Sequence, residues 1–374
     1  MMQERSPGLY VHVPFCASKC GYCDFYSVVN PGAVAHWLDA VSLESKIYKD
    51  LFPPFGTLYV GGGTPSLLGR PDLERLVRNI IEMYTFEAGF EFTLEANPDD
   101  LTQDKLGVLK DLGVNRLSIG VQSFDDAELR LLGRRHDAAS ALGAVEAARR
   151  AGFENIGIDL IYAIPGQTER SLRATLERTL SFEPEHISCY ELTLEPEAPL
   201  ARAIERGEVG KIDEDAGRDL FMIISDVLGG RGYIHYEVSN YARDEGHRSR
   251  HNTRYWDHTP YLGLGPSAHS FAAGVRWWNL YDVDSYCSKL NGGEVPVEGS
   301  ESLSEGQILL ERLYFGFRTA DGLPLDFFDS LPDSRETLAE LELTSLVRIE
   351  KSRVIPTLRG FLLSERLPLL FSAD

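Results

Sequence analysis

The sequence predicts an α/β fold in which six strand–helix units close toward a partial, TIM-like (β/α)6 barrel, followed by a small α+β domain that resembles a winged helix. Two observations support this prediction. Short apolar runs typical of buried strands alternate with amphipathic stretches through the first part of the chain, which is the pattern of parallel βα units. Polar residues and glycines follow the ends of these runs, as on the active face of a βα barrel.

Each expected strand is short and apolar, and a turn and a helical stretch follow it. The strands are Leu9–Val13, Thr57–Val60, Glu91–Leu94, Arg116–Val121, Asn155–Ile161 and His186–Leu192. The helical stretches carry apolar residues three and four positions apart, as at Leu73, Leu76 and Ile80. These stretches are Val34–Lys49, Pro71–Tyr84, Thr102–Leu112, Ala138–Ala151, Thr168–Leu180 and Asp213–Leu228.

The chain changes character twice after this pattern. We expect residues 1–235 to form the barrel, residues 236–300 to form an irregular, aromatic-rich segment, and residues 301–374 to form the small domain. In the last part a helix carries Ile308, Leu313 and Phe317, and it is followed by short helices at Pro324–Ser330 and Ser334–Leu343 and a strand pair at Val347–Ile349 and Val354–Pro356. Because acidic residues outnumber basic ones there, a DNA-reading role is disfavoured, and a docking or lid role suits this domain better.

Composition limits the possible partners and the compartment. The chain has 374 residues, of which 43% are hydrophobic, enough for one large domain and a small one. A net charge of −20 repels nucleic acid and anionic lipid, so neither is expected as a partner. We find no apolar run long enough to span a bilayer and no signal peptide at Met1–Gly8. Five cysteines, of which Cys189 and Cys287 are isolated, favour a reducing cytoplasm over a disulfide framework.

Three cysteines near the start of the chain, Cys16, Cys20 and Cys23, have the spacing C-x3-C-x2-C. Iron–sulfur clusters are usually held by four thiolates, so three would leave one iron of a [4Fe–4S] cluster open to a non-protein ligand. An open position is where an outside molecule can be activated, as in catalytic zinc sites. This is the cysteine signature of the radical S-adenosylmethionine (SAM) superfamily. The alternative is a zinc knuckle with His12 as the fourth ligand.

Polar or glycine residues stand at the ends of five predicted strands. They are Gly61–Thr64, Glu95, Gln122, Asp159 and Glu191. Because the C-terminal ends of parallel strands share one face of a barrel, these residues are expected to line a pocket beside the cysteine loop. The glycines let the backbone approach a ligand closely, which favours a role in holding the amino group of SAM. A phosphate loop is excluded, since no Gly-Lys-Ser/Thr follows. The alternative is that one or two of these residues belong to loops and contact no ligand.

Five segments together resemble the oxygen-independent coproporphyrinogen III dehydrogenase family, the HemN-like radical SAM proteins, over nearly the whole chain. They are Tyr10–Cys16, Gly61–Pro65, Leu94–Pro98, Arg116–Phe124 and Ile158–Pro165. The resemblance implies that the cluster ligands are Cys16, Cys20 and Cys23. It implies SAM contacts from Tyr10, Gly62, Glu95, Gln122, Arg134 and Asp159. Positions that face a second SAM in the dehydrogenases are matched by Tyr22, Gly63 and Thr64, without implying a second SAM here.

Two departures from the dehydrogenases point to the HemW branch of the family, whose members act as heme chaperones. The dehydrogenases carry a further cysteine two residues after the third cluster cysteine, where this chain has Phe25. They also carry a long N-terminal extension, whereas Cys16 lies almost at the start here.

A third feature agrees with that branch. The segment His-Asn-x-x-Tyr-Trp resembles its heme-associated motif, with His251, Asn252, Tyr255 and Trp256 as the heme-binding residues. Imidazole is a common axial ligand of heme iron, and aromatic rings pack on a macrocycle face. Propionates could pair with Arg248, Arg250 or Arg254. The alternative is a buried or surface histidine in an aromatic loop.

The resemblance therefore implies a cytoplasmic heme chaperone that binds a [4Fe–4S] cluster, SAM and heme, and delivers heme to acceptor apoproteins such as respiratory cytochromes. An electron donor such as flavodoxin or ferredoxin is implied if radical chemistry runs, and membrane contact is expected only through acceptor proteins. The rival is a coproporphyrinogen III dehydrogenase, which decarboxylates propionate side chains oxidatively. A third possibility is an interaction protein with a structural cluster. It would leave most of the polar residues at the strand ends without a role.

Overall fold

The protein is built on one large curved sheet. A computed structural model describes residues 5–211 and 214–371, so the predicted Asp213 and part of Met1–Gly8 lie outside the described residues. The sheet has twelve strands in the order β12-β11-β10-β9-β1-β2-β3-β4-β5-β6-β8-β7. Strands β1 to β6 pair in parallel, each with the next, which confirms the predicted α/β class and its six units. Their bounds are Gly8–Val13, Phe55–Gly62, Phe86–Ala96, Arg116–Gln122, Ile156–Tyr162 and His186–Glu191.

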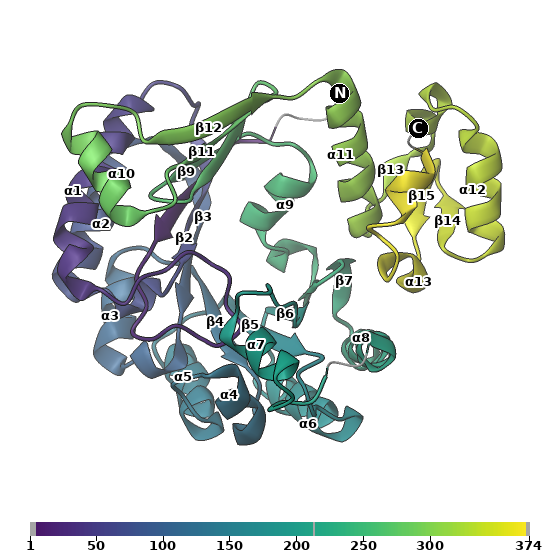
Figure 1. Ribbon diagram of the computed structural model, residues 1–374, viewed down its shortest axis with the longest axis horizontal. Coiled ribbons are helices and arrows are strands. Elements are labelled where there is room, and N and C mark those ends of the chain that lie inside the picture. The colour runs from purple at the N-terminus through teal and green to yellow at the C-terminus, as the bar shows by residue number, and fades with distance from the viewer. Residues whose placement is uncertain (1–4, 212–213, 372–374) are drawn as a thin grey trace.

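Helices cover the convex side of this sheet, and one helix lies on its concave side (Figure 1). The outer helices of the barrel are α1 (Val34–Ile47), α2 (Arg70–Met83), α3 (Gln103–Asp111), α4 (Asp126–Leu132), α5 (Ala138–Arg150), α6 (Glu169–Leu180) and α8 (Glu214–Gly230), and the short α7 (Pro199–Glu205) follows β6. The helix inside the curve is α9 (Arg250–Trp256), which carries the predicted heme motif. Of the barrel helices, α4 and α7 were not predicted, because seven residues are too few for a clear helical period.

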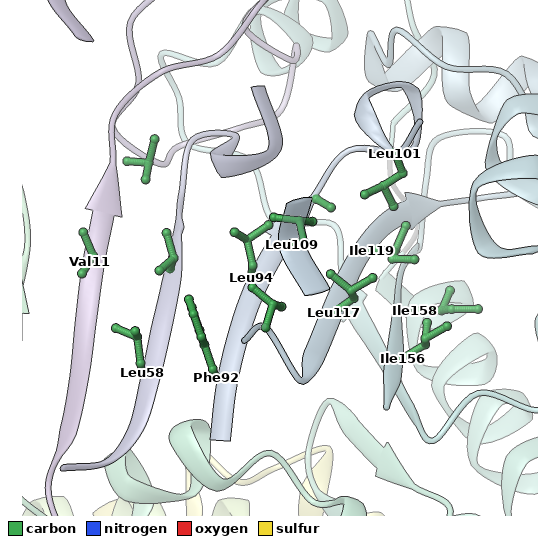
Figure 2. Packing of buried hydrophobic residues seen from close by; sticks show 14 of the residues in the cluster. Val11, Leu58, Phe92, Leu94, Leu101, Leu109, Leu117, Ile119, Ile156 and Ile158 are labelled. Carbon is green, nitrogen blue, oxygen red and sulfur yellow. The ribbon is translucent and has the colours of Figure 1, made fainter. Parts of the chain in front are cut away.

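Strand alternation divides apolar from polar side chains. On β4, Leu117, Ile119 and Val121 are fully buried beneath the outer helices. Leu117 and Ile119 pack in one cluster with Leu94 and Ile158 of the neighbouring strands (Figure 2). Burying one such side chain stabilises the fold by about 1.5–3 kcal/mol. The alternate residues of the same strands face the inside of the curve, where polar side chains predominate.

The prediction of an irregular segment at 236–300 is wrong. This part begins within β7 (Ile234–Glu237), continues through β8 (Asn240–Ala242), and then adds β9 (Tyr261–Leu264), β10 (His269–Ala272), β11 (Val275–Asn279), α10 (Val283–Asn291) and β12 (Val297–Ser302). Strand β9 lies parallel to β1 on the side opposite β2, so the segment extends the sheet beyond its first strand. Its strands are three to six residues long, too short to give a detectable alternation.

The C-terminal part has its own hydrophobic cluster, which includes Leu313, Phe317, Phe328 and Val354. Helix α11 (Glu305–Arg318) leads into a three-stranded sheet of β13 (Leu323–Pro324), β15 (Arg353–Pro356) and β14 (Val347–Glu350), with α12 (Ser334–Leu343) and the short α13 (Leu358–Phe361) beside it. The predicted helices and strand pair of this region are confirmed, except that Leu325–Ser330 forms a 3-10 helix. In the part of the chain that the structure describes, no helix is long and apolar enough to cross a membrane.

A buried carboxylate fixes the added strands against the barrel. Glu44 on α1 is fully buried and accepts hydrogen bonds from the Gly265 backbone N–H at 2.8 Å, from Asn279 Nδ2 and from the Tyr286 hydroxyl. Burial raises the pKa of Glu44 to about 7, although these three donors favour its charged form.

We expect Glu44→Gln to lower the free energy of unfolding by about 1–3 kcal/mol, because the new amide N–H2 would face donors and leave one of them unsatisfied. Urea denaturation measures this, with the exposed Glu82→Gln on α2 as the matched control. Equal urea midpoints for the two variants would contradict the assigned role.

Candidate functional site

A cavity of about 490 Å³ opens at the C-terminal ends of the barrel strands and continues into the barrel. The predicted residues that line it are Tyr22, Cys23, Gly62, Gly63, Thr64, Glu95, Gln122, Arg134, Asp159, Glu191 and Asn252. The structure thus brings together most of the proposed SAM contacts, one residue of the proposed heme motif and one cysteine.

Close backbone contact attaches the cysteine loop to the glycine-rich turn. The N–H of Gly63 donates to the carbonyl of Val13 at 2.8 Å, and the N–H of Thr64 donates to that of Phe15 at 2.7 Å. A Cβ atom on Gly63 would lie 2.7 Å from the Phe15 carbonyl oxygen, so only glycine fits. Gly62 adopts φ +108°, and a Cβ there would meet the His12 ring at 2.6 Å. These glycines therefore allow the loop to lie directly against β2.

The three loop cysteines are free thiols and partly exposed. Thr64 Oγ1 donates to Cys16 Sγ at 3.4 Å, and Arg134 Nη1 donates to Cys20 Sγ at 3.5 Å. Within residues 5–211 and 214–371, no three His, Cys, Asp or Glu side chains are grouped to hold a metal ion. The donor set of three thiols on one loop, two of them hydrogen bonded, nevertheless fits a cluster with one open iron.

The zinc alternative requires a free nitrogen on His12, and the structure gives it none. Its Nδ1 is hydrogen bonded to the Tyr10 hydroxyl at 3.0 Å, and its Nε2 lies 2.9 Å from the Tyr26 carbonyl oxygen. Burial lowers the pKa of His12 to about 4, so this ring is neutral. Tyr10, a predicted SAM contact, supports His12 and is not among the residues that line the cavity.

Glu95, at the end of β3, is the carboxylate closest to the glycine-rich turn. It accepts hydrogen bonds from the Tyr59 hydroxyl at 2.7 Å and from the Gly62 backbone N–H at 3.0 Å. Burial raises the pKa of Glu95 to about 7. A cationic amino group bound beside it would favour the ionised form, which is the role expected for a contact to SAM.

Asp159 and Gln122 face the cavity from β5 and β4. Asp159 Oδ2 accepts a hydrogen bond from Ser118 Oγ at 2.8 Å, and burial raises the pKa of this carboxyl. Gln122 adopts a left-handed φ of +67°, where the register between β4 and β5 shifts. Strained backbone of this kind is concentrated at ligand sites. Arg134 Nη2 donates to the Gly120 carbonyl at 2.8 Å, which fixes the guanidinium between β4 and the cysteine loop.

His251 is buried inside the barrel rather than presented at the surface. Its Nδ1 is hydrogen bonded to Thr57 Oγ1 at 2.8 Å, and its Nε2 to the Tyr255 hydroxyl at 2.9 Å. Its ring stacks on Tyr59 with centroids 4.9 Å apart. Burial, followed by the charge of Arg254, lowers the pKa of His251 to about 3. Coordination of a heme iron would therefore require one of these hydrogen bonds to break.

The other motif residues point in different directions. Asn252 lines the cavity, whereas Trp256 packs on Phe315 of α11, with ring centroids 5.8 Å apart. Among the predicted propionate partners, Arg248 pairs with Glu245 and Asp321, Arg250 Nη1 donates to the Gly89 carbonyl, and the buried Arg254 donates to the Ser6 carbonyl. The structure does not bring this motif together as one heme-binding face.

Several cavity residues were not predicted as site residues. They are Tyr59, Arg116, Ser118, His186, Ser188 and Tyr190. The alternation of side chains along a strand could have identified them, because every second residue faces the same side. Gln122 was predicted to face the pocket, and Arg116, Ser118 and Gly120 lie on the same inner face of β4.

Comparison with known proteins gives the class first. A family model described as the radical SAM superfamily matches residues 10–179. Coproporphyrinogen III oxidase (HemN) from Escherichia coli, described as a radical SAM enzyme, superposes with a TM-score of 0.85 at 25% identity, covering 99% of this chain and 91% of that chain. The fold and the cysteine loop are those of a radical SAM protein.

Curated relatives give the family. The heme chaperone HemW of Lactococcus lactis is 36% identical over 370 residues, which is 96% of each chain. The heme chaperone HemW of Mycobacterium tuberculosis is 34% identical, over 96% of this chain and 93% of the relative. The chain belongs to the HemW family.

In cluster-free protein under anaerobic, non-denaturing conditions, we expect iodoacetamide to modify Cys16, Cys20 and Cys23 and to spare Cys189 and Cys287. The last two are buried, and burial raises the pKa of Cys287 to about 11 and that of Cys189 further, so little reactive thiolate is present. Peptide mass spectrometry measures the modification, with a urea-unfolded sample in which all five thiols react as the control. Rapid modification of Cys189 in the folded protein would be inconsistent with the described core.

Proposed function

We propose that this protein is a heme chaperone that holds a [4Fe–4S] cluster and SAM at the barrel mouth, binds heme, and delivers it to acceptor apoproteins. The observation that carries the proposal is the similarity to heme chaperones over nearly the full length of both chains. Phe25, in the position of the additional dehydrogenase cysteine, supports the chaperone over the coproporphyrinogen III dehydrogenase with which the chain shares its fold.

The cofactors have distinct places in this proposal. Cys16, Cys20 and Cys23 hold the cluster, and Thr64 and Arg134 donate hydrogen bonds to two of the sulfurs. SAM is contacted by Gly62, Glu95, Gln122, Arg134 and Asp159, with Glu95 beside its amino group and Asp159 at its ribose. When bound and reduced, this pair of cofactors can supply a 5′-deoxyadenosyl radical. The barrel positions them and excludes water.

The partners follow from charge and chemistry. We propose respiratory cytochromes as acceptors, flavodoxin or ferredoxin as electron donor if SAM is cleaved, and a cytoplasmic location with membrane contact only through the acceptor. The net charge of −20 disfavours nucleic acid as a partner.

We expect Asp159→Asn to weaken SAM binding about ten- to a hundredfold while about four irons per chain still assemble, because one charge-assisted hydrogen bond is lost and no thiol is touched. Equilibrium dialysis of the anaerobically reconstituted protein measures the SAM affinity, and a colorimetric iron assay measures the irons per chain. The exposed Asp111→Asn is the charge control, and Cys20→Ala should abolish the cluster whereas Cys189→Ala should not. Unchanged SAM affinity in Asp159→Asn would place the SAM site elsewhere.

Heme titration should give a shifted Soret band, and His251→Ala should alter it if this imidazole is an axial ligand. The matched variant is Tyr255→Phe, which removes the hydroxyl bound to His251 Nε2 and leaves that nitrogen available, so its heme affinity should be equal or higher. Added apo-cytochrome should take heme from the loaded protein.

Two results would count against these assignments. An unaltered Soret band in His251→Ala rejects the axial ligand alone. Conversion of coproporphyrinogen III to protoporphyrinogen IX by the reconstituted protein with SAM and reductant would overturn the chaperone proposal in favour of the dehydrogenase.

A further inference from the structure

The floor of the barrel carries a polar group of residues that neither the cluster nor the proposed SAM contacts use. Arg116 is the first residue of β4 and His186 the first of β6, and both line the same cavity as Gln122 at the other end of β4. Arg116 and Gln122 lie six positions apart on β4, a rise of about 20 Å. The floor is therefore well separated from the barrel mouth.

Arg116 is a buried cation that forms no ion pair with a described residue. Only 2% of it is exposed, its Nη1 reaches Thr93 Oγ1 at a long 3.5 Å, and its Nε has no hydrogen-bond partner among the described residues. The nearest carboxylates are engaged elsewhere. Glu91 accepts from the first two N–H groups of α9, at 3.1 and 3.0 Å, and Asp159 accepts from Ser118. Burial lowers the pKa of Arg116, but the charge of Glu91 and other nearby groups outweighs this and raises it, so the guanidinium stays charged. Because its Nε remains without a hydrogen-bond partner, a ligand that supplies an anionic acceptor would be favoured here.

His186 adds a second unsatisfied group. Its Nε2 lies 2.8 Å from the Tyr236 hydroxyl, which in turn accepts from the Ser249 N–H at 3.3 Å. A Tyr236 hydroxyl that accepts from Ser249 can give its own proton to Nε2, and in that tautomer the proton of the neutral ring is on Nδ1. That Nδ1 is buried and has no partner among residues 5–211 and 214–371. Burial, followed by the charge of Arg116, lowers the pKa of His186 well below its ordinary value, so the ring stays neutral.

The two groups meet over a glycine. A Cβ atom built on Gly157, in β5 between the two strands, would lie 3.4 Å from Arg116 Nη2 and 3.5 Å from His186 Nδ1. Glycine inside a strand weakens it, and it often marks a place where a ligand approaches the backbone. Both donors thus lie within van der Waals distance of the position that a side chain on Gly157 would take, and Arg116 and His186 themselves line the cavity.

We infer that the barrel floor over Gly157 is a carboxylate-binding site, with Arg116 and His186 as its donors. A guanidinium and a neutral imidazole supply one positive charge, which matches a carboxylate better than a doubly charged phosphate. Of the ligands in the proposed function, heme carries this group in its propionates, whereas the methionine carboxylate of SAM stays with the amino group beside Glu95 at the barrel mouth. The choice of heme as a probe rests on the proposed function, whereas the site itself follows from the geometry of the floor.

The test compares each ligand with an analogue that lacks the carboxylate. Dissociation constants of heme and heme dimethyl ester, and of propionate and propionamide, are measured on the reconstituted protein, on Gly157→Ala and on Arg116→Gln. Each variant should weaken binding of the carboxylate about ten- to a hundredfold and binding of its uncharged analogue much less. A response of propionate alone would show that the floor binds a carboxylate other than that of heme.

Controls separate binding from folding. The Gly157→Ala methyl would sit at van der Waals distance from its neighbours, so its melting temperature should match that of Gly143→Ala on α5, where a Cβ meets open space. If both variants leave the two ligand–analogue differences unchanged, Arg116 and His186 only support the fold and the inference is wrong. If the unaltered protein fails to bind heme, the proposed function fails, and the propionate pair alone decides the barrel-floor site.

Discussion

The backbone contact between the end of β1 and the glycine-rich turn after β2 is the constraint on which the rest of the site depends. It places the cysteine loop, which continues β1, within hydrogen-bond distance of Thr64 and close to Glu95. The contact needs two adjacent residues without side chains, because a Cβ on Gly62 or Gly63 would overlap the His12 ring or the loop carbonyls. A single methyl group there would push apart the thiols and the carboxylates, which come from different strands.

A polar barrel interior has consequences for its ionisable groups. Most βα barrels fill this space with packed apolar layers, whereas here the inner face carries carboxylates, hydroxyls and a guanidinium. Desolvation disfavours their charged forms, so Glu95 titrates near neutrality and His251 stays neutral throughout the physiological range. Few of the ionisable groups in the interior therefore carry a charge in the absence of a ligand. Binding of a charged ligand would change the protonation of these groups.

The sequence was sufficient to predict the six parallel strands, most of their helices and the side chains at the barrel mouth. These elements depend on local periodicity and on the shared direction of parallel strands, both of which can be read along the chain. The strands after residue 236 were missed because their pairing, as in β9 with β1, is determined by residues far apart in sequence. The surroundings of His251 were not predictable either, since its partners Thr57 and Tyr59 lie almost 200 positions away.

The position of β1 affects the order in which the protein can fold. This strand, from which the cysteine loop extends, lies between β2 and β9, and its residues 8–11 pair with residues 261–264. On the ribosome, β1 can find its first neighbour early but lacks its second until more than two-thirds of the chain has been made. Contacts of such sequence separation close slowly and leave strand edges open meanwhile. Metal capture by the nascent cysteine loop before β9 has been made would therefore occur on an unfinished sheet.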